Sequence, residues 1–229
     1  LQGSNPLQVD IGIKDNGLLI NKQKAMTKFQ YRAQAPLSKQ ASFDELIGIQ
    51  ASLLLHSDKK LTAFQRQSYL QLPKNLNQRS KDLAVNIRDQ STSDLDFIKI
   101  LSDYYLSNKF FYTLSPGEAN SDDRVDEFLF DTRIGFCAHY AGSAVYLLRS
   151  AGIPSRVVLG YLGGEKNPLG DYYSVYQYDA HAWVEVWLAG MGWLRIDPTG
   201  WVSPERVDQG MEQAVKPVAY THLTLPTNR

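Results

Sequence analysis

The chain contains one cysteine, which lies in the stretch Gly135-Phe136-Cys137-Ala138-His139-Tyr140-Ala141. Small and apolar residues continue from there to Ala151, which predicts a helix over residues 137–151 with the cysteine at its start. Gly152-Ile153-Pro154 follows and is typical of a helix end. Stretches rich in β-branched and aromatic residues come next, at 156–162, 172–178, 181–188 and 193–197. The second half of the chain is therefore predicted to be α+β.

The N-terminal part of the chain has a different pattern. Apolar residues alternate at 7–13 and at 47–55, and Asp15-Asn16-Gly17 is a turn signal after the first run. Leu72-Pro73 then breaks the alternation. We therefore expect a small β-rich unit over residues 1–71.

Helical spacing begins after that break, at residues 83–88 and at 94–107, where Asp94 is the expected cap. We expect one core domain over residues 72–210. The tail, residues 211–229, has no periodicity, so we expect it to be disordered or foreign to the natural protein and assign it no function.

Composition excludes several classes of protein. Lys plus Arg and Asp plus Glu number 24 each, so no overall field favours nucleic acid, and we expect no nucleic-acid partner. One cysteine permits no internal disulfide and no cysteine-built zinc site. The sequence has no apolar run of ~18 residues, so the chain as given is not expected to span a membrane. We expect neither a metal nor a cofactor.

Cys137 is the candidate nucleophile. A helix N-terminus presents unpaired backbone N–H groups and a partial positive charge, which stabilise a thiolate and lower the pKa of a thiol. The alternative is that Cys137 is a small buried hydrophobic residue, as free cysteines often are.

A thiol nucleophile needs a base, and the chain has four histidines: His56, His139, His181 and His222. His139 follows Cys137 by two positions, about 200° round a helix, so it does not face the same substrate. His181 lies in an alternating stretch that places it on one face of a strand with Trp183 and Glu185. It is the candidate base, and the alternative is a structural strand histidine.

Asp197 is the candidate third member of the site. It ends the strand after His181, and the two strands form a hairpin if they pair around Ala189 or Gly190. His181 and Asp197 then lie on one face, where the carboxylate can hold the imidazole N–H. The alternative is that Asp197 belongs only to an Asp-Pro-Thr turn.

This order of Cys, His and Asp resembles the transglutaminase-like superfamily, and within it the bacterial membrane-anchored proteins whose transglutaminase core lies outside the cytoplasm. The matching stretches are residues 126–130, 135–141, 147–158, 160–161, 180–187 and 192–199. The resemblance implies a papain-like core, with the cysteine-bearing helix packed on an antiparallel sheet, as the catalytic domain over residues 72–210. It also implies an extracytoplasmic, periplasmic location and a membrane-anchored parent protein.

The implied activity is acyl transfer on glutamine side-chain amides through a thioester at Cys137, with His181 and Asp197 completing a catalytic triad. The implied partners are a polypeptide that bears glutamine and an amine acceptor. Cysteine peptidase or amidase activity would use the same triad, and a non-catalytic interaction module is the third reading. The sequence indicates neither the natural substrate nor the oligomeric state.

Stabilisation of the oxyanion is only half assigned by the sequence. The backbone N–H of Cys137 is one expected donor. The resemblance implies a second donor from an upstream tryptophan, as in the eukaryotic enzymes of the superfamily, but all four tryptophans here follow the cysteine. Tyr112 and Gln177 remain candidates. Calcium dependence is not carried over, because Asp122, Asp123 and Asp126 lack the spacing of a calcium loop.

Overall fold

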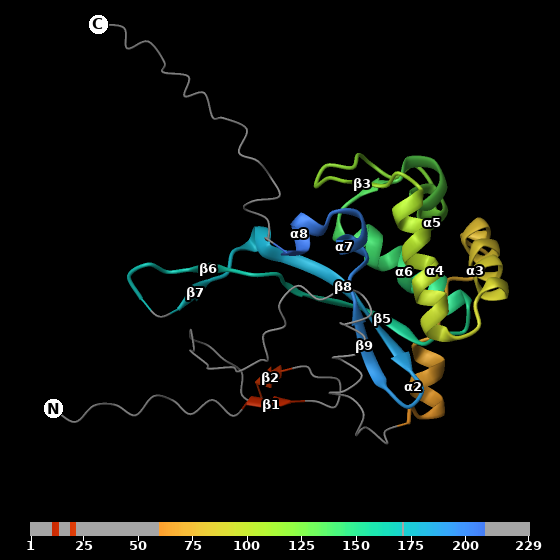
Figure 1. Ribbon diagram of the computed structural model, residues 1–229, viewed down its shortest axis with the longest axis horizontal. Coiled ribbons are helices and arrows are strands. Elements are labelled where there is room, and N and C mark those ends of the chain that lie inside the picture. The colour runs from red at the N-terminus through yellow and green to blue at the C-terminus, as the bar shows by residue number, and fades with distance from the viewer. Residues whose placement is uncertain (1–10, 14–18, 22–59, 171, 209–229) are drawn as a thin grey trace, which may run out of the picture. The chain divides into compact units, whose positions relative to one another are not determined.

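The computed structural model describes residues 11–13, 19–21, 60–170 and 172–208 (Figure 1). The chain divides into two compact units, residues 1–39 and 40–229. In the first, β1 (Ile11–Ile13) pairs antiparallel with β2 (Leu19–Asn21), as the alternation and turn signal predict. The second predicted alternating run, 47–55, and the tail, 211–229, lie outside the described residues.

The second unit is a mixture of helices and short strands. In chain order they are α2 (Ala63–Ser68), α3 (Gln78–Gln90), α4 (Asp94–Ser107), β3 (Phe111–Tyr112), α5 (Arg124–Asp126), the π-helix η1 (Glu127–Thr132), β4 (Ile134–Gly135), α6 (Cys137–Ser150), β5 (Ser155–Tyr161), β6 (Glu165–Lys166), β7 (Tyr173–Ser174), the 3-10 helix η2 (Gln177–Asp179), β8 (Ala180–Leu188), β9 (Gly192–Ile196), α7 (Pro198–Val202) and α8 (Pro204–Asp208). The predicted helices at 83–88, 94–107 and 137–151 are confirmed as α3, α4 and α6. Ser93 rather than Asp94 caps α4, because the Ser93 side chain accepts from the Asp96 N–H.

The main sheet is antiparallel, with the strand order β5-β8-β9. Helix α6 packs on one face, where Val184, Val186 and Leu194 are fully buried. Figure 1 shows α3, α4 and α5 gathered around α6 on the side away from this sheet. An antiparallel sheet covered by the cysteine-bearing helix confirms the predicted α+β class.

One predicted strand is wrong. Residues 172–178 hold only the short strand β7, which pairs with β6, and they continue into the turn η2. Tyr172 and Tyr173 are 51% and 66% exposed. Aromatic residues favour strands mainly where a neighbouring strand and a packed face bury them, and here most of the segment lacks both.

The core forms where α4 and α6 meet. Its completely buried members include Phe97, Ile98, Tyr140, Leu147 and Leu148. Each such side chain contributes roughly 1.5–3 kcal/mol when it leaves water. The start of α6 is therefore held on a rigid, well-packed base.

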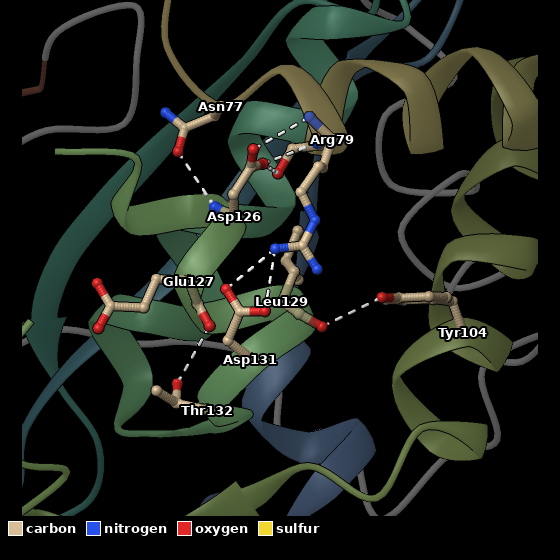
Figure 2. A network of polar contacts seen from close by, with 9 residues as sticks. Asn77, Arg79, Tyr104, Asp126, Glu127, Leu129, Asp131 and Thr132 are labelled. Atoms are coloured by element: carbon tan, nitrogen blue, oxygen red, sulfur yellow. Dashed lines mark hydrogen bonds and ion pairs between the residues drawn. The ribbon is translucent and has the colours of Figure 1, made fainter. Parts of the chain in front are cut away.

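A reciprocal capping arrangement fixes the segment that leads to Cys137 (Figure 2). Asn77 is the N-cap residue before α3; it has a left-handed conformation, and its side chain makes no capping hydrogen bond to α3. Instead, the Asp126 carboxylate accepts from the backbone N–H groups of Arg79 and Ser80, at 3.0 and 2.8 Å, and from the Ser80 hydroxyl. The Asn77 side-chain oxygen in turn accepts from the N–H groups of Val125 and Asp126. Residues 126–130 of the matching stretches thus begin with a structural carboxylate.

Candidate active site

Cys137 is the first residue of α6, as predicted, and its side chain is 9% exposed. The chain enters the helix through Gly135, which has no room for a side chain. A Cβ there would lie 2.7 Å from the Cβ of His139 and 2.8 Å from the Phe128 ring. His139 itself accepts a hydrogen bond from the Phe136 N–H through Nδ1 at 3.3 Å, so it caps the helix. His139 therefore has a structural role at the start of α6.

His181 and Asp197 come together across the β8–β9 hairpin. Val184 pairs with Ile196 and Leu188 with Gly192, which centres the hairpin on Gly190 and puts His181 and Asp197 on one face as diagonal neighbours. Nε2 of His181 lies 2.7 Å from Oδ2 of Asp197. The sequence leaves two registers open, centred on Ala189 or on Gly190, and the structure has the second.

Asp197 also belongs to the turn that follows. Its other oxygen, Oδ1, accepts from the Thr199 N–H at 3.2 Å, and the residue is the N-cap of α7. Asp197 is therefore both a partner of His181 and a turn residue, because Oδ2 contacts the imidazole and Oδ1 caps the N-terminus of α7.

The surroundings of His181 favour imidazolium. The side chain is buried, which lowers its pKa, but the hydrogen bonds and charges of Asp197 and Cys137 outweigh burial and raise the pKa to about 9. Nδ1 is buried and has no hydrogen-bond partner of standard geometry among the described residues. Since Nε2 is occupied by Asp197, Nδ1 is the nitrogen left to exchange a proton with Cys137.

The surroundings of Cys137 favour thiolate. Burial opposes ionisation, yet the neighbouring His181 imidazole, the nearby Ala182 N–H and the charge of Arg206 lower the pKa of the thiol below its usual 9.0. A thiolate and an imidazolium therefore stabilise each other.

The two oxyanion candidates occupy different environments. Tyr112 lies beside Gly135 in the parallel β3–β4 pair, and the Cys137 backbone N–H interacts with its hydroxyl. Gln177 is exposed and accepts from the Tyr161 hydroxyl at 3.5 Å. Of these two candidates, only Tyr112 interacts with Cys137 among the contacts of the described residues.

Arg206 was not foreseen from the sequence. It is fully buried on α8, and its charge acts on the Cys137 thiol. A five-residue helix has no periodicity that could place it at the site, so no sequence signal identifies it.

The tryptophans pack across strands. Trp187 and Trp193 meet edge to face at 5.4 Å, and Trp183 stacks beside His181 at 6.4 Å with Arg195 over its ring. Among the described residues there is no group of three or more metal-ligating side chains. None of the helices described in this chain is long and apolar enough to cross a membrane.

Comparison with known proteins gives consistent relatives. Over 146 residues the chain is 52% identical to the protein-glutamine gamma-glutamyltransferase of Pseudomonas aeruginosa, covering 64% of this chain and 22% of that protein. Over 143 residues it is 40% identical to the uncharacterized protein YebA of Bacillus subtilis, covering 59% and 19%. The chain thus spans about a fifth of the length of these relatives.

Solved structures agree with the sequence relatives. The periplasmic domain of TgpA from Pseudomonas aeruginosa matches with a TM-score of 0.66 and 49% identity, over 68% of this chain and 54% of that one. The same domain bound to ethylmercury matches with a TM-score of 0.64 and 48% identity, over 66% and 54%. A family model, the transglutaminase-like superfamily, matches residues 81–198, which is more than half of the 229 residues. The chain therefore belongs to the transglutaminase-like superfamily.

Proposed function

We propose that this chain carries out cysteine-dependent acyl transfer on glutamine side chains, with Cys137 as nucleophile, His181 as acid and base, and Asp197 as the residue that orients the imidazole. The observation that carries the proposal is the 2.7 Å contact between Asp197 and His181 together with a thiol whose pKa is lowered by that same imidazole. A relative with 52% identity is named a protein-glutamine gamma-glutamyltransferase.

In the first half-reaction the Cys137 thiolate attacks the carboxamide carbon and an oxyanion forms. Nδ1 of His181 then gives its proton to the leaving nitrogen, so that ammonia departs and a thioester remains. Asp197 fixes the ring through Nε2 and stabilises the imidazolium.

In the second half-reaction an amine, such as a lysine side chain, attacks the thioester. Neutral His181 removes a proton from the attacking nitrogen and returns to imidazolium as Cys137 leaves as thiolate. Water can take the place of the amine, in which case the product is glutamate. The balance depends on access of each nucleophile to the thioester.

The location and the parent protein are part of the proposal. The solved structure that this chain resembles is the periplasmic domain of TgpA. The chain matches 22% of the length of its relative in Pseudomonas aeruginosa. We place the chain outside the cytoplasm as one domain of a longer, membrane-anchored bacterial protein.

The test uses the chain with a fluorescent primary amine and a glutamine-bearing protein whose own lysines are blocked by dimethylation. The proposal predicts amine incorporation together with ammonia release, and loss of both in Cys137→Ala. Ammonia release without incorporation would indicate hydrolysis. New N-termini in the substrate would indicate a peptidase, and no reaction with a folded chain would favour a non-catalytic module.

A further inference from the structure

Arg206 is buried, and no ion pair neutralises it within the part of the chain that the structure describes. Its side chain has no exposure, and no carboxylate of the described residues forms an ion pair with it. A guanidinium removed from water without a counter-charge is strongly disfavoured, and apolar residues usually replace it where only packing is needed. The location of Arg206 therefore needs an explanation beyond packing.

Two of its nitrogens reach the elements that build the site. Nε donates to the Tyr112 hydroxyl at 3.3 Å, and Nη2 donates to the backbone oxygen of Ala180, the residue before His181, at 3.5 Å. The third nitrogen, Nη1, is buried and has no partner among the described residues. The cation thus bridges β3 and the start of β8 and keeps one donor unused.

Tyr112 is oriented by these contacts. Its oxygen accepts from Nε of Arg206 at 3.3 Å and also interacts with the backbone N–H of Cys137. A phenol whose oxygen accepts from a fixed cation directs its own proton to another group, which must be an acceptor. Burial raises the pKa of Tyr112, so the proton stays on the oxygen at neutral pH. The group next to it that becomes negative is the Cys137 sulfur, and during reaction the oxyanion formed on the attacked carbon.

We propose that Arg206 is a positioning residue of this active site, which holds the Tyr112 hydroxyl as an oxyanion donor and supplies the positive charge that stabilises the Cys137 thiolate. The inference rests on the proposed thiol nucleophile. When the Cys137 thiolate attacks the carboxamide carbon, negative charge moves from the sulfur to the carboxamide oxygen. The buried Arg206 cation stabilises both the thiolate and the oxyanion without changing its position.

The proposal is tested by the pH dependence of iodoacetamide alkylation, which reports the thiolate whether or not a substrate is known. Cys137 is the only cysteine, so intact mass assigns the adduct without ambiguity. In Arg206→Met we expect alkylation at pH 6 to slow by about tenfold, because the thiolate loses a buried positive charge. Arg206→Lys, which keeps the charge and loses the planar fork, is expected to retain most of the rate.

Tyr112→Phe separates the two roles. It leaves the Arg206 charge in place, so alkylation at pH 6 is expected to slow much less than in Arg206→Met. The value of kcat for amine incorporation should fall about a hundredfold with KM nearly unchanged, as for loss of an oxyanion donor. Glu205→Gln, an exposed neighbour on α8, is the control for disturbance of that helix and should match the unsubstituted chain in both measurements.

Equal alkylation profiles for Arg206→Met and the unsubstituted chain would overturn the charge role. If Arg206→Met does not fold, Arg206→Lys decides. Alkylation slowed about tenfold at pH 6 in Arg206→Lys, with Glu205→Gln unchanged, would overturn the charge role, because the positive charge is still present. Unchanged kcat in Tyr112→Phe would overturn the donor role. Failure of the proposed function would look different, because Cys137 would then react no faster than a peptide thiol in every variant.

Discussion

Nε2 of His181 lies 2.7 Å from Oδ2 of Asp197, although the two residues are diagonal rather than direct partners in the β8–β9 hairpin. The diagonal is possible because Asp197 follows the last residue of β9 and turns its carboxylate back toward β8. A slip of one residue in the hairpin would send the two side chains to opposite faces of the sheet.

Replacement of Asp197 by asparagine should reduce acyl transfer by about a thousandfold or more, because the imidazole loses control of its tautomer and the partner of its positive charge. The amide keeps an oxygen that can cap α7, so the fold should remain. Asp197→Ala also loses this cap and should cost a further ~1 kcal/mol of unfolding free energy. Kinetics and urea unfolding of both variants measure these effects. Near-normal turnover in either variant would reduce Asp197 to a turn residue.

The pH dependence of Cys137 alkylation should report the ion pair. The thiol pKa is lowered, so the reaction should already be fast at pH 6 to 7 and exceed that of a model peptide thiol. The pKa of His181 is raised to about 9, so imidazolium persists up to that pH and is lost as the pH rises through it. Transfer activity should therefore decline above about pH 9. In Asp197→Asn this alkaline limit should move to lower pH, and an unmoved limit would assign it to another group.

Gly135 and Gly142 lie on either side of Cys137 in the sequence and differ in the space available for a Cβ atom. Gly135→Ala places a Cβ within 2.7 Å of His139, so we expect a loss of about 1–3 kcal/mol in unfolding free energy and a slower reaction at Cys137. Gly142 lies within α6, and a Cβ added there would meet no atom within 4 Å, so Gly142→Ala should stabilise the helix by about 0.5–1 kcal/mol. Thermal unfolding and alkylation of both variants decide this. Equal behaviour would show that the entry into α6 is not tightly packed.

The Asp126 carboxylate should matter for stability rather than chemistry. Asp126→Ala leaves two backbone N–H groups and the Ser80 hydroxyl without their acceptor, so we expect a loss of about 2–4 kcal/mol. The control is Asp131→Ala, which removes an exposed pair with Arg79 and should cost less than about 1 kcal/mol. Urea unfolding compares the two. A similar small loss for both would contradict the capping role.

The fold around the site was predictable where the pattern is local. Helix α6 has a clear start and a glycine-proline end, and the β8–β9 register follows from alternation on both sides of a short turn. The tyrosines of 172–178 were misleading, because strand propensity cannot tell whether a neighbouring strand exists.

The remaining parts of the site depend on tertiary contacts. Asn77 and Asp126 cap each other's helices across 49 positions, and Arg206 meets Tyr112 across 94. Neither contact has a periodic or spacing signal in the sequence. The sequence sets His139 aside as the base, and its role as a cap is recognisable only from its bond to Phe136.

The thioester itself is the most direct test of the account. The chain is incubated without amine with a glutamine peptide, quenched in acid and examined by intact mass. We predict an adduct equal to the peptide minus ammonia, located at Cys137, released by hydroxylamine and absent in Cys137→Ala. Release of ammonia from the peptide by Cys137→Ala at the rate of the unsubstituted chain, or an acyl adduct from a cleaved peptide backbone at Cys137, would contradict it.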